Sequence, residues 1–122
     1  MISKARRSPA TGPMLAEVTN AIVGLHARHY GKGPTRSKSY LLDDQLLCVM
    51  QDVYTTVERT LIDVGKASHV RETRLAFQDA MEADFTGVVE RITGRHVRAC
   101  ISQVCVDPDV AIHVFMLAPE AG

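Results

Sequence analysis

Two stretches of this chain pair extended, apolar-rich segments around a short acidic turn, and they constrain the fold more than any other feature. A period of two places successive side chains on opposite faces of a strand, and Asp and Pro favour tight turns. Each stretch therefore predicts an antiparallel β-hairpin. The segments are residues 35–42 and 45–52 around Asp43-Asp44, and residues 96–106 and 110–118 around Asp107-Pro108-Asp109.

In the first hairpin, a two-residue turn places Leu42 opposite Gln45 and separates two faces of different character. We expect one face to form part of the core and the other to be half-exposed. The core face carries Leu41, Leu46, Cys48 and Met50 with Ser37 and Ser39, and the other carries Arg36, Lys38, Tyr40, Leu47 and Val49.

The second hairpin is apolar on both faces if Val106 pairs with Val110. A strand pair of this kind needs a cover on each side. Helices can supply one cover, and a second copy of the chain is the natural candidate for the other, so the sequence predicts a homodimer. One face holds Cys100, Val104, Ile112, Val114 and Met116, and the other holds Ala99, Ile101, Phe115 and Leu117.

Two long segments, residues 13–30 and about 67–93, have helical periodicity instead. Each is followed by a glycine that can end a helix, Gly31 or Gly94. Gly87 inside the second segment suggests close packing against another backbone. The expected buried stripes are Leu15, Val18, Ile22, Leu25 and His29 in the first segment, and Val70, Arg74, Phe77, Met81, Phe85, Val88 and Ile92 in the second.

Between the two hairpins, Thr55-Thr56-Val57-Glu58 matches a capping box and predicts a short helix that ends at Gly65 and buries Val57 and Leu61. The order α-β-β-α-α-β-β then predicts an α+β fold of two layers, with two antiparallel hairpins in one sheet and helices packed on it. We expect a single domain over residues 13–119, preceded by a flexible basic arm over residues 1–12.

Charge is unevenly distributed along the chain, although the net charge is zero. Residues 1–38 hold seven basic residues and a single acidic residue, Glu17. This asymmetry can attract an anionic partner, or it can serve attraction within the chain or between subunits. Binding of an anion, nucleotide or nucleic acid would require Arg36 and Lys38 to be exposed on a common face with Arg28 or Lys32. The low aromatic content of 5% does not favour nucleic acid.

Arg74 interrupts the apolar stripe of the second long helix with a charge. A buried guanidinium needs a carboxylate or several acceptors, so one hypothesis places Arg74 in a buried ion pair or helix cap. The other joins it to Arg71 and His69 as an anion site near the start of the helix, where the helix dipole is favourable. The candidate binding residues are therefore Arg36, Lys38, Arg71 and Arg74.

No pattern in the sequence indicates an enzyme, a metal site or a bound cofactor. Gly31-Lys32-Gly33 follows a helix rather than a strand, so a helix stop explains it better than a phosphate-binding loop. His29 lies on an apolar stripe one turn from His26, and we expect it to be partly buried and hydrogen-bonded. The three cysteines are expected to be small core residues.

The chain has no apolar run near the ~18 residues that a membrane span needs. Its basic N-terminal residues are not followed by the apolar segment of a signal peptide. The odd number of cysteines, without a framework spacing, suits a reducing compartment. These features predict a cytoplasmic protein.

Five segments carry motifs that occur together in one bacterial family. They are AIVGLHARHYGKGP, TTVERTLIDVG, VRETRLAFQDAM, ITGRHV and SQVCVDPDVAIHVFML, and they span nearly the whole domain between Met14 and Leu117. Together they resemble the MpsC family, whose name describes a component of a Na+-translocating system that generates a membrane potential. The resemblance implies a link to ion transport and brings no catalytic residues. For a chain without a membrane span, it implies an accessory or regulatory role.

The sequence as a whole favours a non-enzymatic, cytosolic interaction or regulatory module that forms a homodimer and binds an unknown protein partner. The alternative is anion, nucleotide or nucleic-acid binding through the basic first third. An enzyme would instead show a concave pocket with several convergent titratable groups.

Overall fold

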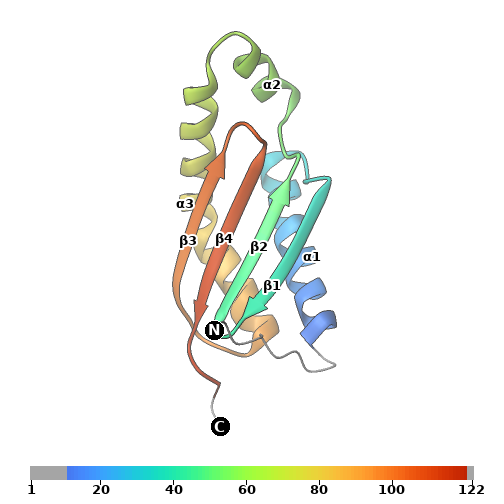
Figure 1. Ribbon diagram of the computed structural model, residues 1–122, viewed down its shortest axis with the longest axis vertical. Coiled ribbons are helices and arrows are strands. Elements are labelled where there is room, and N and C mark those ends of the chain that lie inside the picture. The colour runs from blue at the N-terminus through green and yellow to red at the C-terminus, as the bar shows by residue number, and fades with distance from the viewer. Residues whose placement is uncertain (1–10, 121–122) are drawn as a thin grey trace, which may run out of the picture.

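The computed structural model of the chain describes residues 11–120. The predicted arm lies outside the described residues except for Thr11 and Gly12, which belong to the first helix. The elements follow the expected order (Figure 1): α1 (Thr11–Tyr30), β1 (Arg36–Leu42), β2 (Gln45–Gln51), α2 (Thr56–Asp63), α3 (Ala67–Thr93), β3 (Val97–Cys105) and β4 (Val110–Leu117).

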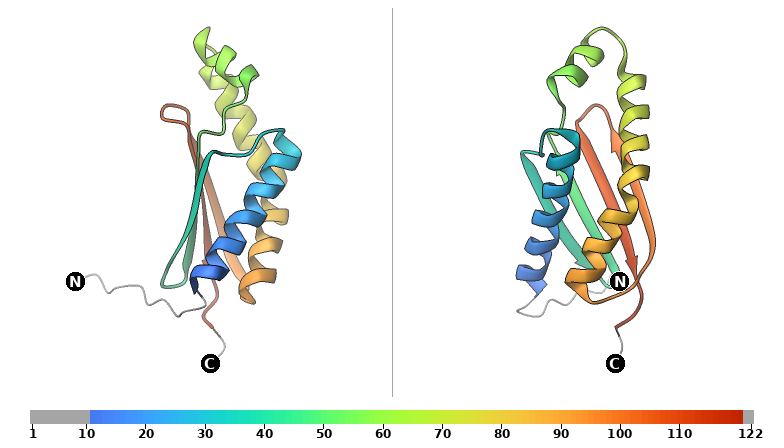
Figure 2. Two further views of the ribbon diagram at one scale, coloured as in Figure 1. Left: turned by 90° about the vertical axis from the view of Figure 1, so that its right-hand side faces the viewer. Right: turned by 180° about the vertical axis from the view of Figure 1, so that it is seen from behind.

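The four strands form one antiparallel sheet in the order β1-β2-β4-β3. Helices α1 and α3 lie on the same face of this sheet, and α2 extends with the start of α3 beyond one end of it (Figure 2). The predicted two-layer α+β fold is confirmed. The two long helices form one layer and the sheet forms the other.

The first hairpin has the predicted register, with Leu42 opposite Gln45. Asp43 takes a φ of 54°, in the left-handed region that tight hairpin turns use. Leu46, Cys48 and Met50 are fully buried toward the helices. A two-residue turn and a period of two were therefore sufficient to predict both faces of this hairpin.

The second hairpin differs from its predicted register by one residue, because Cys105 rather than Val106 pairs with Val110. The turn consequently has four residues. Tyr54 holds this turn from outside the hairpin: its hydroxyl donates to the carbonyl of Val106, and its backbone N–H donates to the carboxylate of Asp109 at 2.8 Å. These bonds keep Val106 out of the strand pairing.

The shifted register changes which side chains of β4 face the helices. Ala111, His113, Phe115 and Leu117 are buried against the helical layer. Ile112, Val114 and Met116 lie on the other side and are half-buried. Phe115 and Leu117 therefore share a face with Cys100 and Val104, contrary to the prediction.

Helix α3 has the predicted bounds, and Val70, Arg74, Met81 and Phe85 are buried as predicted. The remaining predicted positions differ, because Gln78 and Val89 are buried in place of their neighbours Phe77 and Val88. Phe77, Val88 and Ile92 are only half-buried. A Cβ added at Gly87 would meet no atom within 4 Å, so the predicted close approach there is wrong. Gly94 ends the helix with a φ of 69°, as predicted. The buried residues are Val70, Arg74, Gln78, Met81, Phe85 and Val89.

Helix α1 buries His26 rather than His29, which is exposed. Nδ1 of His26 lies 3.1 Å from the carbonyl oxygen of Lys32. Its ring packs at 5.0 Å from the ring of Tyr30 and 5.4 Å from that of Phe77 on α3. The prediction for His29 was wrong because the position of α3 decides which side of α1 is covered.

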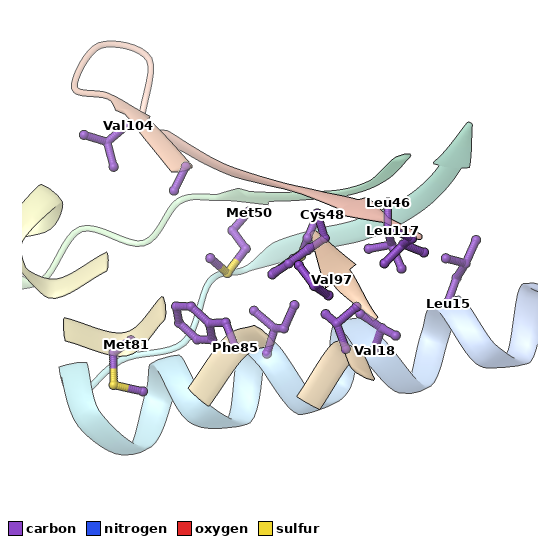
Figure 3. Close-up of a cluster of buried hydrophobic side chains, with 14 residues drawn as sticks. Leu15, Val18, Leu46, Cys48, Met50, Met81, Phe85, Val97, Val104 and Leu117 are labelled. Carbon is purple, nitrogen blue, oxygen red and sulfur yellow. The ribbon is translucent and has the colours of Figure 1, made fainter. Parts of the chain in front are cut away.

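The core fills the space between the two helices and the sheet, and Figure 3 shows its apolar side chains gathered from both layers. His113 is fully buried beside them. Its ring lies 4.9 Å from that of Phe85 and 6.1 Å from that of Phe115. The hydroxyl of Ser102 lies 2.6 Å from its Nδ1. Burial lowers the pKa of His113 from 6.5 to about 4.

We predict that acid destabilises the fold through His113. Its folded-state pKa is depressed, so between pH 6.5 and about 4 the unfolded chain binds the extra proton, and stability is lost as pH falls through this window. At one pKa unit per about 1.4 kcal/mol, the loss attributable to this residue is about 3 kcal/mol. Urea unfolding at several pH values should show a flatter pH dependence for His113→Asn than for wild type. His29→Asn, at an exposed histidine, is the matched control, and equal slopes for wild type and His113→Asn would contradict the prediction.

Candidate interaction surface

One face of the sheet is left uncovered by the part of the chain that the structure describes. Helices α1 and α3 both pack on the opposite face (Figure 2). Leu46, Cys48 and Met50 are buried on that face (Figure 3). Side chains at the alternate positions therefore point away from the helices. We call this uncovered side the open face.

The open face is apolar at its centre and largely polar at its edges. The central strands present Leu47 and Val49 on β2 and Ile112, Val114 and Met116 on β4. Ile101 on β3 adds a side chain that is 56% exposed. The edge strands add Arg36, Lys38 and Tyr40 on β1 and Gln103 and Cys105 on β3. An apolar centre inside a polar rim is the usual anatomy of a protein interface.

Arg36 and Lys38 lie on the open face of β1, as predicted for a half-exposed strand side. They border a concave area of about 280 Å³ that Tyr40, Val49 and Gln51 also line. The ammonium of Lys38 lies 5.2 Å from the centre of the Tyr40 ring, which is within the range of a cation–π contact.

Asp52 partly neutralises this basic corner. Nε of Arg36 lies 3.3 Å from the Asp52 carboxylate. The hydroxyl of Thr35 donates to the same carboxylate at 2.8 Å. The Thr35 hydrogen bond, with help from Arg36, lowers the pKa of Asp52.

The other two basic residues named for an anion site do not join Arg36 and Lys38. Arg28 belongs to α1, which covers the opposite face of the sheet. The ammonium of Lys32 donates to the backbone carbonyl of Tyr54 at 2.6 Å. Among the described residues, the structure therefore does not bring Arg28 or Lys32 into one continuous patch with Arg36 and Lys38.

Arg74 is 4% exposed and lies in a buried ion pair. Its Nε and Nη2 donate to the two carboxylate oxygens of Glu58 at 2.9 Å and 2.8 Å. A second carboxylate, that of Asp109, lies 3.8 Å from Nη1. The guanidinium also lies over the rings of Tyr54 at 4.6 Å and Tyr30 at 5.3 Å. This geometry is that of the structural hypothesis for Arg74.

Arg71 does not share a ligand site with Arg74. Its Nη1 donates to the backbone carbonyl of Val104 at 2.8 Å, and the guanidinium of Arg74 is already bound to Glu58. His69 is exposed on the first turn of α3. The pair proposed from the sequence as an anion site thus consists of one residue tied to the edge strand β3 and one residue buried in an ion pair.

The carboxylate of Glu58 has more partners than a capping box alone requires. It accepts from the backbone N–H of Thr55 at 3.0 Å, while the Thr55 hydroxyl accepts from the N–H of Glu58 at 3.1 Å. It also accepts from the hydroxyl of Tyr30 and from Arg74. Turning Glu58 inward turns Val57 outward, where it is 70% exposed. The prediction that α2 buries Val57 was therefore wrong.

Sequence reasoning did not name Glu58, Asp109, Tyr30 or Tyr54 as partners of Arg74. The available signal was the charge on an apolar stripe, which requires a buried carboxylate but does not say which one. Glu58 is separated from Arg74 by 16 positions and Asp109 by 35. The pairing depends on how α2 folds back against α3.

The glycine, histidine and cysteine positions considered as possible sites in the sequence have structural roles or show no site. Gly31 ends α1 with a φ of 86°, as the helix-stop interpretation predicts. Burial lowers the pKa of His26 and raises that of the Cys48 thiol to about 11. Cys105 is exposed, contrary to the expectation for a core residue. Within residues 11–120, no group of three His, Cys, Asp or Glu side chains could hold a metal ion.

Comparison with known proteins connects this fold to a family. A family model described as the Na+-translocating membrane potential-generating system (MpsC) matches residues 10–119. The chain belongs to the MpsC family. No curated protein and no solved structure matches it. Among the described residues of this MpsC family member, no helix is both long and apolar enough to cross a membrane.

We predict that the Arg74–Glu58 pair is essential to the stability of this MpsC chain. Arg74→Met leaves the buried Glu58 carboxylate without its main partner, and removal of one partner of a buried pair costs about 3–5 kcal/mol. Arg71→Met, which loses one hydrogen bond to a backbone carbonyl, should cost less. Chemical unfolding of both variants measures the difference.

A double-mutant cycle tests the pairing itself. Glu58→Gln removes the charge that Arg74→Met leaves behind, so the double variant should be more stable than the sum of the two single losses implies. Additive losses would contradict the pairing. An Arg74→Met chain as stable as wild type, with a lost response to phosphate or sulfate, would instead support the anion site.

Proposed function

We propose that this MpsC family member is a non-enzymatic interaction module that forms a homodimer through its open face. The uncovered apolar centre of the sheet is the observation that carries this proposal. Large exposed apolar patches with polar rims mark interaction sites. The side chains at the centre come from β2 and β4, which are the two middle strands of the sheet.

The size of the open face fits such a contact. Four strands about 4.8 Å apart and seven residues long at about 3.3 Å per residue give a footprint of about 440 Å². This footprint includes the polar edge strands, and the apolar centre on β2 and β4 is a part of it. Apolar patches of about 300–600 Å² on monomers often have a function. Two sheets can pack face to face about 10 Å apart, with their inner side chains interdigitating.

A second copy is a suitable occupant because the centre of the face is free of charge. A two-fold contact brings the same patch of both copies together, so an apolar centre meets an apolar centre. A two-fold axis parallel to the strands places β1 of one copy opposite β3 of the other. Arg36 and Lys38 on β1 then stay apart from their counterparts and remain in the rim.

The family description suggests where such a module acts. The matched model names a Na+-translocating membrane potential-generating system. We propose an accessory or regulatory role for this chain beside such a system, through a protein partner in the cytoplasm. The geometry supports a binding role rather than catalysis, because the buried charged groups Arg74, Glu58 and Asp109 are already used in an ion pair, a helix cap and a turn.

Light scattering tests the dimer. At micromolar concentration the wild-type chain should have about twice the chain mass of 13.4 kDa. Val114→Glu places a charge at the centre of the open face and should give a monomer with unchanged helical content. Val57→Glu makes the same replacement on α2, away from this face, and should remain a dimer.

A second open-face variant tests the dimer if Val114→Glu fails to fold. Ile101 is 56% exposed on β3, so Ile101→Glu should tolerate the charge in the monomer and still weaken the dimer. A wild-type chain that stays at 13.4 kDa over the whole concentration range overturns the homodimer. Dimers that persist in both open-face variants place the contact elsewhere.

A further inference from the structure

Within residues 11–120, strand β1 forms one edge of the sheet, because it pairs with β2 alone. Hydrogen-bonded positions alternate along an antiparallel pair. Two hydrogen bonds at the ends of β2 show which of its positions bond toward β4. The carbonyl of Asp44 accepts from the N–H of Leu117, and the N–H of Asp52 donates to the carbonyl of Asp109. Even-numbered positions of β2 therefore bond toward β4. Odd-numbered positions of β2 therefore bond toward β1, through its residues 36, 38, 40 and 42. The backbone groups of Ser37, Ser39 and Leu41 face the free edge.

A groove lies beside this edge, between β1 and α1. Its volume is about 340 Å³. Two small residues of α1, Gly12 and Ala16, line the helix side, and Ser37 and Ser39 line the strand side. The Ser37 hydroxyl is buried and has no hydrogen-bond partner among the described residues. The groove thus has room beside the edge and an unused polar group in its wall.

The charged side chains of β1 are both basic, although Arg36 already pairs with Asp52 at 3.3 Å and Lys38 has no such carboxylate partner among the described ion pairs. Arg36 and Lys38 project on the open-face side, two residues apart, and β1 carries no acidic residue. A strand added to this edge would place every second side chain beside them and the intervening ones beside the groove. Acidic residues suit the first set and small or hydroxyl residues suit the second.

We propose that the free edge of β1 and the α1–β1 groove bind an extended acidic peptide segment of a partner protein by strand addition. Main-chain hydrogen bonds supply affinity in this mode, and the alternating side chains supply specificity. A second copy of β1 is a poor occupant, because paired edges would bring Arg36 and Lys38 close to the same charges of the other copy. This site differs from the proposed dimer contact, which uses the centre of the open face, although Arg36 and Lys38 also belong to the rim of that face.

The probe is a seven-residue peptide of alternating Glu and Thr with blocked ends. NMR titration of the full chain should show saturable shifts centred on the amides of Ser37, Ser39 and Leu41. A peptide of alternating Lys and Thr should not bind. N-methylation of every second amide of the acidic peptide should abolish binding if the main chain is the recognised group.

Two variants separate strand addition from general charge attraction. Lys38→Glu should weaken the acidic peptide about tenfold or more, and Arg98→Glu, at the other edge strand, is the matched control that should not. Ser37→Pro removes a main-chain donor that faces away from β2, so it should leave the sheet intact and lose the peptide. Far-ultraviolet circular dichroism checks the fold of each variant.

Three outcomes overturn the proposal. They are no saturable binding by the acidic peptide, shifts centred on the open face instead of β1, and competition by inorganic pyrophosphate as strong as that by the peptide. The last outcome would assign the site to small anions. Light scattering on the same samples separates the peptide-binding result from the dimer proposal. Ser37→Pro should lose the peptide and keep the same molecular mass as wild type.

Discussion

The buried pair of Arg74 and Glu58 holds together parts of the chain that the core alone does not join. It links α3 to α2, and the surrounding Tyr30, Tyr54 and Asp109 bring in α1, the segment between β2 and α2, and the turn before β4. Burying two charges costs several kcal/mol, and only bidentate geometry with further hydrogen bonds offsets that cost. Here both conditions are met, so the pair fixes how α2 folds back on α3.

The same interaction and the same layer arrangement explain why apolar surface remains exposed. The polar side of α2 is used inside, so Val57 faces solvent. Both long helices lie on one face of the sheet (Figure 2), so residues 11–120 leave the centre of the other face open. A chain of this size has one core, between two layers. The uncovered face is therefore a consequence of the topology, and its apolar centre gives it the composition of a contact surface.

Arg36 and Lys38 link the two proposed surfaces. They belong to the rim of the open face and also to the edge strand beside the α1–β1 groove. Basic side chains on an edge strand discourage pairing with identical edges and favour an acidic segment. Two of the basic residues in the first third of the chain are therefore placed together on β1, whereas Arg28 and Lys32 lie elsewhere.

Local chemistry in the sequence determined the elements, their ends and the first hairpin: Gly31 and Gly94 end helices, and the two-residue turn sets its own register. Alternation also placed Arg36 and Lys38 together on one strand face. Tertiary structure decided the rest. The turn before β4 depends on Tyr54, more than fifty positions away, and the partner of Arg74 depends on the fold of α2. The choice of His26 over His29 depends on α3. Spacing along a helix or strand limits which side chains share a face, but the neighbour that covers a face comes from another element, and only packing in three dimensions selects it.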